Sequence, residues 1–221
     1  MMYSFAQRKD TTVVDEPFYA NYLKTTGIDH PGKDEVLASQ ENDGKKVIEN
    51  IILGGYDTQV VFFKQMTHHL IYLDLSFLHD MKNIMLIRDP KKVLYSYSKV
   101  IEQPTLEGIG IKKSFELYEY LEKYNAHYII IDADNFLKDP EVTLRKICEG
   151  CEIEFDINML HWQAGARKED GVWAKYWYAN VHQSTGFEKY KETEIILPQH
   201  LLSVYNEAKK YYDILKNIEL Q

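Results

Sequence analysis

The chain has few cysteines and no long hydrophobic run. Only two cysteines, Cys148 and Cys151, stand among its 221 residues, with two residues between them. A zinc site needs a second pair of ligands, and the C-x-x-C redox motif normally opens a helix, whereas this pair closes a helix that begins at Pro140. We therefore expect two core or near-surface thiols, and we expect no metal.

Signals for export, membrane insertion and nucleic-acid binding are also missing. The first ten residues, MMYSFAQRKD, turn polar before the apolar part of a signal peptide could form, and no apolar run approaches the length of a membrane span. A formal charge of −8 argues against sequence-independent nucleic-acid binding, which needs a basic face. We expect a cytoplasmic protein without a nucleic-acid or membrane partner; a small anionic ligand and a homo-oligomer remain compatible with the sequence.

The composition is that of an ordinary globular protein. Hydrophobic residues make up 45% of the chain and charged residues 27%, which excludes wholesale disorder. The length suits one domain, and we expect a single domain over residues 1–221. Seventeen tyrosines are unusual, and many of these amphipathic side chains are expected at the edge of a cleft.

Apolar periodicity and turn residues predict alternating strands and helices. Strands are expected at residues 11–14, 59–63, 83–87 and 127–131, and helices at residues 3–8, 17–24, 34–54 with a break at 42–44, 112–124, from Pro140, and 198–216. A further helix is expected to start at Pro90, with Asp89 as N-cap and with Val93, Leu94, Tyr97, Val100 and Ile101 on one face. Residues 156–196 form an irregular aromatic segment between the last two helices.

This alternation indicates a doubly wound parallel sheet flanked by helices. The strands at 59–63 and 83–87 are continuous apolar runs, which are typical of strands buried on both faces. Ligands of such sheets bind beyond the carboxyl ends of the strands. The residues that follow each strand are therefore site candidates: Asp15 and Glu16, Lys64 to His69, Arg88 and Asp89, and Asp132 to Asp134.

Two basic elements could bind an anion. Arg88 directly follows a strand and precedes a helix N-terminus, and Ser96 lies eight residues further along that helix. The later run Arg167-Lys168 is followed by Gly171 and then by a tryptophan, a composition that can wrap an anion with side chains and backbone. A structural salt bridge for Arg88 and a solvated turn for the later loop are the alternatives.

Together these elements resemble the sulfotransferase family that uses phosphoadenosine phosphosulfate (PAPS), with its P-loop nucleoside triphosphate hydrolase-like fold. The phrases VVDEP-x-YA-x-YL, FFKQMTHHL, LIRDP, EDGVW and WY-x-NVH-x-STGF are similar to a subgroup that is sometimes mislabelled branched-chain aminotransferase-like. The resemblance implies transfer of a sulfuryl group from PAPS to a hydroxyl of a small acceptor. It also implies that Arg88, Ser96, Arg167 and Gly171, and less directly Lys168, hold the ribose-bound phosphate.

The reaction needs a base for the acceptor hydroxyl and a cation for the charge on the bridging oxygen. The resemblance implies a Lys and a His after the third strand, here Lys64 with His68 or His69, or a Glu after the second strand, here Glu16. Relatives usually separate the Lys and the His by one residue, whereas three residues separate Lys64 from His68. His68 and Glu16 therefore remain rivals for the base, with His69 close behind.

Three side chains of the aromatic segment could bind the acceptor. Trp177, Tyr178 and His182 stand among amides and hydroxyls, a mixture that suits a sugar, a phenol or another hydroxylated molecule. Packing of these aromatic side chains against the sheet is at least as good an interpretation.

Members of the resembling family begin with a strand and a phosphate-binding loop, whereas this sequence begins at what resembles the middle of the following helix. We therefore expect a sheet without that first strand and its loop, with exposed pairing edges and an incomplete donor site. Two rival hypotheses stay open. One is a nucleotide-dependent phosphoryl transferase that would hold Mg²⁺ with Asp15, Asp132 or Asp134. The other is a non-catalytic nucleotide-binding protein.

Overall fold

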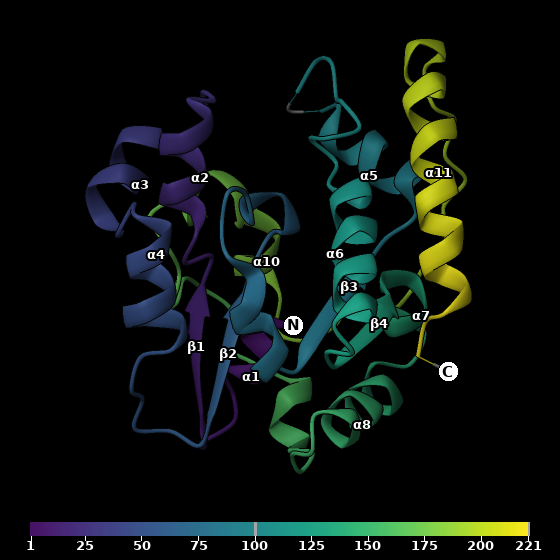
Figure 1. Ribbon diagram of the computed structural model, residues 1–221. Coiled ribbons are helices and arrows are strands. Elements are labelled where there is room, and N and C mark those ends of the chain that lie inside the picture. The colour runs from purple at the N-terminus through teal and green to yellow at the C-terminus, as the bar shows by residue number, and fades with distance from the viewer. Residues whose placement is uncertain (100, 221) are drawn as a thin grey trace. The chain divides into compact units, whose positions relative to one another are not determined.

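The computed structural model describes residues 1–99 and 101–220, and these residues form two compact units. The first unit comprises Met1–Phe77 and Phe155–Glu188, and the second comprises Leu78–Glu154 and Lys189–Gln221. Each unit contains one pair of parallel strands with helices beside it (Figure 1). The single domain expected over residues 1–221 stays a prediction.

The first unit is built around strands β1 (Thr11–Asp15) and β2 (Val60–Lys64). They pair in parallel, from Thr11 opposite Val60 to Asp15 opposite Lys64. Its other elements are α1 (Met2–Phe5), α2 (Tyr19–Thr26), α3 (Lys33–Ser39), α4 (Gly44–Val47), the π-helical turn η1 (Ile48–Ile52), η2 (Thr67–His69), η4 (Ile157–Leu160), α9 (Ala174–Trp177) and α10 (Ala179–Gln183). The 3₁₀ helix η3 (Leu75–Asp80) runs from the first unit into the second.

Several aromatic side chains lie in the core of the first unit. Phe5 of α1 stacks on Phe62 of β2, with 4.2 Å between the ring centroids. Trp173 is buried in a cluster with Tyr19, Ala20, Leu23 and Val36. Trp173 lies in the segment expected to be irregular, so the returning stretch 155–188 contributes to the core that the first 77 residues build.

The second unit is built around strands β3 (Asn83–Ile87) and β4 (Tyr128–Asp132). They also pair in parallel, from Asn83 opposite Tyr128 to Ile87 opposite Asp132. Its helices are α5 (Pro90–Tyr97), α6 (Ile111–Lys123), α7 (Ala133–Lys138), α8 (Pro140–Gly150), the short η5 (Gln199–Leu201) and α11 (Leu202–Asn217).

The helix starts predicted at Pro90 and Pro140 are confirmed. The Asp89 carboxylate accepts a hydrogen bond from the Lys91 N–H at 2.7 Å at the start of α5, and Asp139 caps α8 in the same way. Leu94 of α5 is fully buried against Leu197 and Leu201. Val100, which was assigned to the same apolar face, lies outside the described residues.

The expected burial of two strands on both faces is wrong. Every residue of β2 is half-buried, and Leu86 of β3 is 50% exposed. Each strand belongs to a two-stranded sheet, and the elements packed on the faces of these sheets leave part of the apolar side chains exposed. The parallel pairing and the flanking helices confirm the α/β class.

Some shorter elements also differ from expectation. Helix α7 was not predicted; it forms because the Asp132 carboxylate caps it by accepting from the N–H groups of Asp134 and Asn135. Within residues 156–196, α9 and α10 interrupt the irregular path. The thiols follow the prediction: Cys148 is buried in α8, and burial raises the pKa of Cys151 to about 11. In the described chain, no helix is long and apolar enough to cross a bilayer.

Candidate functional site

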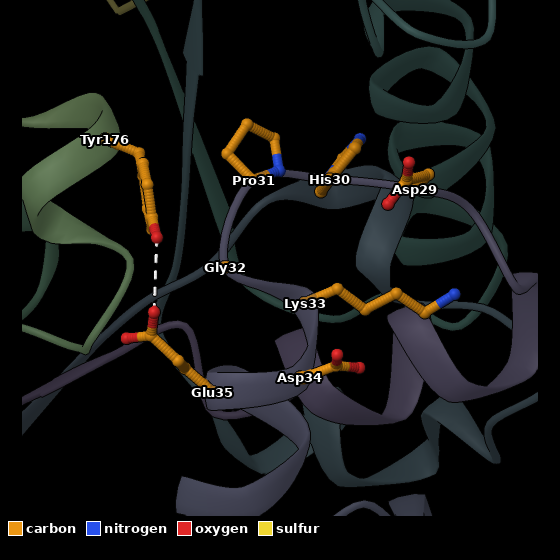
Figure 2. Close-up of a pocket in the computed structure, with 8 residues that line it drawn as sticks. All are labelled: Asp29, His30, Pro31, Gly32, Lys33, Asp34, Glu35 and Tyr176. Carbon is orange, nitrogen blue, oxygen red and sulfur yellow. Dashed lines mark hydrogen bonds between the residues drawn. The ribbon is translucent and has the colours of Figure 1, made fainter.

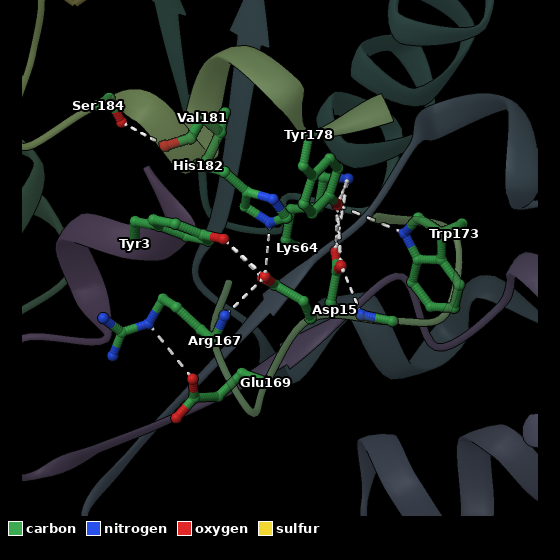
Figure 3. Close-up of polar contacts among 12 residues, drawn as sticks. Tyr3, Asp15, Lys64, Arg167, Glu169, Trp173, Tyr178, Val181, His182 and Ser184 are labelled. Carbon is green, nitrogen blue, oxygen red and sulfur yellow. Dashed lines mark hydrogen bonds and ion pairs between the residues drawn. The ribbon is translucent and has the colours of Figure 1, made fainter. Parts of the chain in front are cut away.

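Charged side chains of the first unit gather where β1 and β2 end (Figure 3). The parallel register places Asp15 opposite Lys64, and the Glu16 N–H donates to the Lys64 carbonyl at 2.8 Å. The register therefore brings two carboxylates and one ammonium to the same edge of the strand pair. Ligands of parallel α/β sheets bind at this edge.

The Lys64 ammonium has three acceptors. It donates to Glu16 Oε1 and, at 2.8 Å, to the hydroxyl of Tyr178, and it lies 3.5 Å from Asp15 Oδ1. Desolvation lowers the pKa of Lys64 below its usual value, and the nearby Asp15 carboxylate opposes that shift. Burial likewise raises the pKa of Asp15, against the attraction of Lys64. Lys64 and Asp15 thus each limit the pKa shift that burial imposes on the other.

Glu16 occupies a strained and buried position. Its φ of 42° lies in the left-handed region, which costs energy for a residue with a Cβ. Its second carboxylate oxygen, Oε2, is 3.7 Å from Nδ1 of His69. His69 is 2% exposed, and its ring stacks on Tyr19 at 4.8 Å and on Tyr22 at 4.6 Å. The buried Nδ1 makes no hydrogen bond with any residue that the structure describes.

His68 lies beside this group but makes different contacts. Its ring meets Tyr22 edge-on at 5.4 Å, and it is half-buried. Desolvation, with smaller contributions from His30 and Lys64, lowers the pKa of His68 to about 4. His68 is therefore a neutral imidazole at physiological pH.

A buried carboxylate organises the late basic loop. Asp170 accepts from the Tyr3 hydroxyl at 2.7 Å and from the Arg167 N–H at 2.9 Å, and it lies 3.0 Å from His182 Nε2. The Arg167 guanidinium packs over the Tyr3 ring at 5.4 Å and donates to Glu169 at 3.3 Å. These contacts fix the loop backbone, and the guanidinium keeps donors for another ligand.

The other two loop candidates differ strongly in environment. The Lys168 side chain is 91% exposed, and its nearest carboxylate oxygen, on Glu169, is 3.9 Å away. The Gly171 N–H already donates to Asp15 Oδ2 at 3.3 Å, a long bond. A Cβ on Gly171 would lie 2.1 Å from the Trp173 ring, so close packing of the indole explains the glycine.

The three acceptor candidates of the aromatic segment are all engaged by the protein. The Tyr178 hydroxyl donates to Asp15 Oδ2 at 2.8 Å, and His182 pairs with Asp170. Trp177 packs at the edge of the buried Trp173 cluster, 6.2 Å from the His30 ring. For Tyr178 and His182 these polar contacts provide a structural role.

An open pocket of about 590 Å³ lies on the surface of the first unit (Figure 2). Its lining residues are Asp29, His30, Pro31, Gly32, Lys33, Asp34, Glu35 and Tyr176. Glu35 is tied to Lys175 at 2.6 Å and to the Tyr176 hydroxyl at 3.2 Å. None of the candidate residues from the sequence lines this pocket.

The second unit contains the other two donor-site candidates, Arg88 and Ser96. Arg88 directly follows β3 and Ser96 lies in α5, and both side chains are exposed. Arg88 makes no hydrogen bond or ion pair with any residue that the structure describes, so the alternative of a structural salt bridge is wrong within that part of the chain.

The carboxylates considered for a magnesium ion already have protein partners. Asp132 accepts from the Tyr212 hydroxyl at 2.7 Å and pairs with Lys216 at 3.1 Å, and Asp134 pairs with Lys92 at 2.7 Å. Asp15 is engaged by Lys64 and Tyr178, as described above. Over residues 1–99 and 101–220, no three His, Cys, Asp or Glu side chains are arranged to hold a metal ion.

Two contributors to this site were missed in the sequence. Tyr3 and Asp170 lie 167 positions apart; neither follows a strand, and Asp170 was given no role although it lies within the phrase EDGVW. No local pattern could have paired them. Asp15 was recognised as a strand-end residue, but its contacts with Tyr178 and Gly171 depend on the fold.

Comparison with known proteins identifies the family. Residues 1–217 match the sulfotransferase domain family, and the chain belongs to it. The solved structure of the sulfotransferase domain from the curacin biosynthetic pathway aligns with a TM-score of 0.50 at 15% identity, covering 89% of this chain and 77% of that one. At this identity the likeness shows the fold alone.

Two curated relatives come from Arabidopsis thaliana. Branched-chain-amino-acid aminotransferase-like proteins 1 and 2 are 39% and 40% identical to this chain over 218 and 220 residues, which is 98% of this chain in each case. The chain spans only 39% of the length of each relative. Their names carry the aminotransferase-like label that the sequence resemblance implies.

Proposed function

We propose that this chain transfers a sulfuryl group from PAPS to a hydroxyl of a small-molecule acceptor. The observation that carries the proposal is the Lys64–Glu16 pair at the carboxyl end of β1 and β2, in a chain of the sulfotransferase domain family. A cation beside a carboxylate supplies both kinds of group that the reaction needs.

The proposed step balances without a metal or a redox partner. A bond forms between the acceptor oxygen and the sulfur, and the bond between the sulfur and its bridging phosphate oxygen breaks. The acceptor proton passes to a carboxylate oxygen of Glu16, and adenosine 3′,5′-bisphosphate leaves. The Lys64 ammonium stabilises the negative charge that develops on the bridging oxygen.

Among the three rival bases, the contacts favour Glu16. Its strained backbone and its pairing with Lys64 place a carboxylate at the strand end, and such strain often marks functional residues. His69 is buried between two tyrosines and has little access to an acceptor. His68 meets the Tyr22 ring edge-on, and within the described residues it has no hydrogen bond or ion pair with Lys64.

For the donor, we propose that Arg88 and Ser96 of the second unit bind the phosphate on the ribose; for Arg167 and Gly171 of the first unit the role implied by the resemblance stays a prediction. Arg88 supports this role most directly, because its guanidinium is exposed and has no partner among the described residues. Lys168 contributes as an exposed surface charge. Trp177 and His182 remain candidates for acceptor contact.

The test of donor binding is calorimetric titration of the chain with adenosine 3′,5′-bisphosphate. The matched variants are Arg88→Ala and Arg145→Ala, the latter removing an exposed arginine paired with Glu141 in α8 of the same unit. We expect binding by the unmodified chain and by Arg145→Ala, and a loss of at least about tenfold in affinity for Arg88→Ala. Equal affinities in all three proteins, or no binding by the folded chain, would contradict the proposed donor site.

A further inference from the structure

Lys64 contacts one residue that takes part in the proposed reaction and two residues that do not. An ammonium has three N–H donors, and here the three neighbouring acceptors are Glu16, Tyr178 and Asp15. Figure 3 shows Lys64 beside Tyr178 and Asp15. Glu16 is the proposed base. Tyr178 and Asp15 have no part in the proposed step, yet the Tyr178 hydroxyl accepts a hydrogen bond from the ammonium and Asp15 forms an ion pair with it at 3.5 Å.

Tyr178 and Asp15 also bind each other. The Tyr178 hydroxyl donates to both carboxylate oxygens of Asp15, at 2.9 and 2.8 Å. Asp15 is almost completely buried, with 1% of its side chain exposed, and it also accepts from the Gly171 N–H at 3.3 Å. Trp173 Nε1 donates to the Tyr178 hydroxyl at 3.4 Å. Asp15 and Tyr178 are therefore held by hydrogen bonds that do not involve Lys64.

We propose that Asp15 and Tyr178 are positioning residues that hold the Lys64 ammonium in place, so that Tyr178 does not bind the acceptor. This inference rests on the proposed sulfotransferase function. A lysine ammonium sits on a flexible four-carbon stem, and ordering it costs rotamer entropy. Two acceptors that are already hydrogen-bonded to each other order the Lys64 side chain before PAPS binds, so this entropy is lost before the reaction.

The same arrangement links proton transfer to the freedom of Lys64. When the acceptor proton moves to Glu16, the carboxylate loses its charge and becomes a weaker partner for the ammonium. Lys64 is then held by Asp15 and Tyr178, and its third N–H is available to the bridging oxygen of the departing phosphate. Base and cation thus act in the same step, while the positioning pair stays unchanged.

The pKa of Lys64 depends on the titratable groups that face its ammonium. The titratable groups that face it are Asp15, Glu16, Asp170, Tyr178, His68, His69 and the Met1 amino group. Asp15 is the largest opposing influence on the pKa of Lys64 after desolvation. Removing its charge must therefore lower the pKa of Lys64 further.

The test uses Tyr178→Phe, Asp15→Asn and the matched control Tyr176→Phe. Phenylalanine at position 178 keeps the ring that packs beside the Trp173 cluster and removes only the hydroxyl. Tyr176 lies two residues away, and its hydroxyl bonds to Glu35 at the surface. Far-UV circular dichroism and thermal unfolding establish that each variant is folded before it is compared.

The first measurement is independent of activity: ¹³C NMR titration of a chain with labelled lysine side chains, with Lys64 assigned through a Lys64→Met variant. We expect Asp15→Asn to lower the pKa of Lys64 and Tyr176→Phe to leave it unchanged. An unchanged pKa in a folded Asp15→Asn variant would overturn the inference, because Asp15 would then not contact the ammonium in solution.

The second measurement is turnover with PAPS, using 4-nitrophenol, benzyl alcohol and glucose as acceptor probes. We expect Tyr178→Phe to lower kcat by about tenfold to a hundredfold, the effect of one hydrogen bond to a charged group, with KM for the acceptor changed less than about twofold. A rise in KM with unchanged kcat, or kcat equal to that of Tyr176→Phe, would overturn the positioning role and leave the proposed function intact. Absence of transfer by the unmodified chain would contradict both.

Discussion

The two strand pairs end in chemically different groups. At the end of β1 and β2, Lys64 is engaged by Glu16, Asp15 and Tyr178, and little of the cluster is exposed. At the end of β3, Arg88 is exposed and has no partner among the residues that the structure describes. A group that must react in a defined geometry benefits from a fixed environment, whereas a group that binds an anion must be accessible. The contrast matches the roles proposed for the two ends.

The largest effect on turnover is expected when the proposed base of the first unit, the Glu16 carboxylate, is removed. Glu16→Gln keeps the size of the side chain and abolishes its basicity, so we expect turnover at saturating PAPS to fall by about a hundredfold or more. His68→Gln is the matched control, and we expect it to change turnover by less than about threefold. Steady-state kinetics at pH 7 measures both; the reverse order would make His68 the base.

Burial of histidine in the first unit predicts an acid-sensitive fold. The pKa of His68 is about 4 against an ordinary 6.5, so the native state binds a proton less readily than the unfolded chain. This contribution to stability is fully present above pH 6.5 and is lost as the pH falls through 4. We expect about 1 to 2 kcal/mol, less than the full shift implies, because His68 keeps some contact with water.

Urea unfolding between pH 4 and pH 7 measures this contribution. We expect His68→Gln to lose less stability on acidification than the unmodified chain. His200→Gln, at an exposed position of the second unit, should retain the original pH dependence. The same pH dependence in all three proteins would show that His68 is solvated and that the cluster is more open than described.

A smaller difference, in affinity for the bisphosphate, is expected between Arg167 and Lys168. Arg167 is held by Tyr3 and Glu169 at the edge of the cluster, whereas Lys168 is almost fully exposed. We expect Arg167→Ala to weaken binding of adenosine 3′,5′-bisphosphate by about tenfold and Lys168→Ala by less than about threefold. Calorimetric titration at fixed salt measures both affinities; a larger loss for Lys168→Ala would mean that the loop rearranges on binding.

The smallest effect is expected at the surface of the first unit. Lys175 and Glu35 form an ion pair at 2.6 Å, but both side chains are about half exposed. Solvent screening makes such pairs weak, so we expect Lys175→Ala to leave the unfolding temperature unchanged within error. A clear fall in that temperature would show that contact between α3 and α9 holds the unit together.

The sequence predicts the parts of this structure that depend on local signals. Asp89 was recognised as a helix cap because it precedes a proline, the second helix start was recognised from Pro140, and the apolar strands were recognised from their composition. The strand-end rule also selected Asp15, Glu16, Lys64 and Arg88. Local patterns carry this information because capping and strand formation involve residues close together in the chain.

Other features depend on contacts between distant residues and were not predictable. Tyr178 was expected to contact an acceptor, and only the fold brings its hydroxyl to Asp15, 163 positions away. Half-burial of β2 and exposure of Leu86 were missed because apolar composition reports the tendency to be buried and does not report how many neighbours cover a strand. Helix α7 was missed because its cap, Asp132, is also the last residue of β4.

The most direct test of the proposed activity is transfer of ³⁵S from labelled PAPS to the three acceptor probes named above, with the unmodified chain and with Glu16→Gln. The account predicts a labelled acceptor and stoichiometric adenosine 3′,5′-bisphosphate from the unmodified chain, and at most about one hundredth of that rate from the variant. Binding of the bisphosphate without transfer to any of the three acceptors would contradict the account and indicate a nucleotide-binding protein.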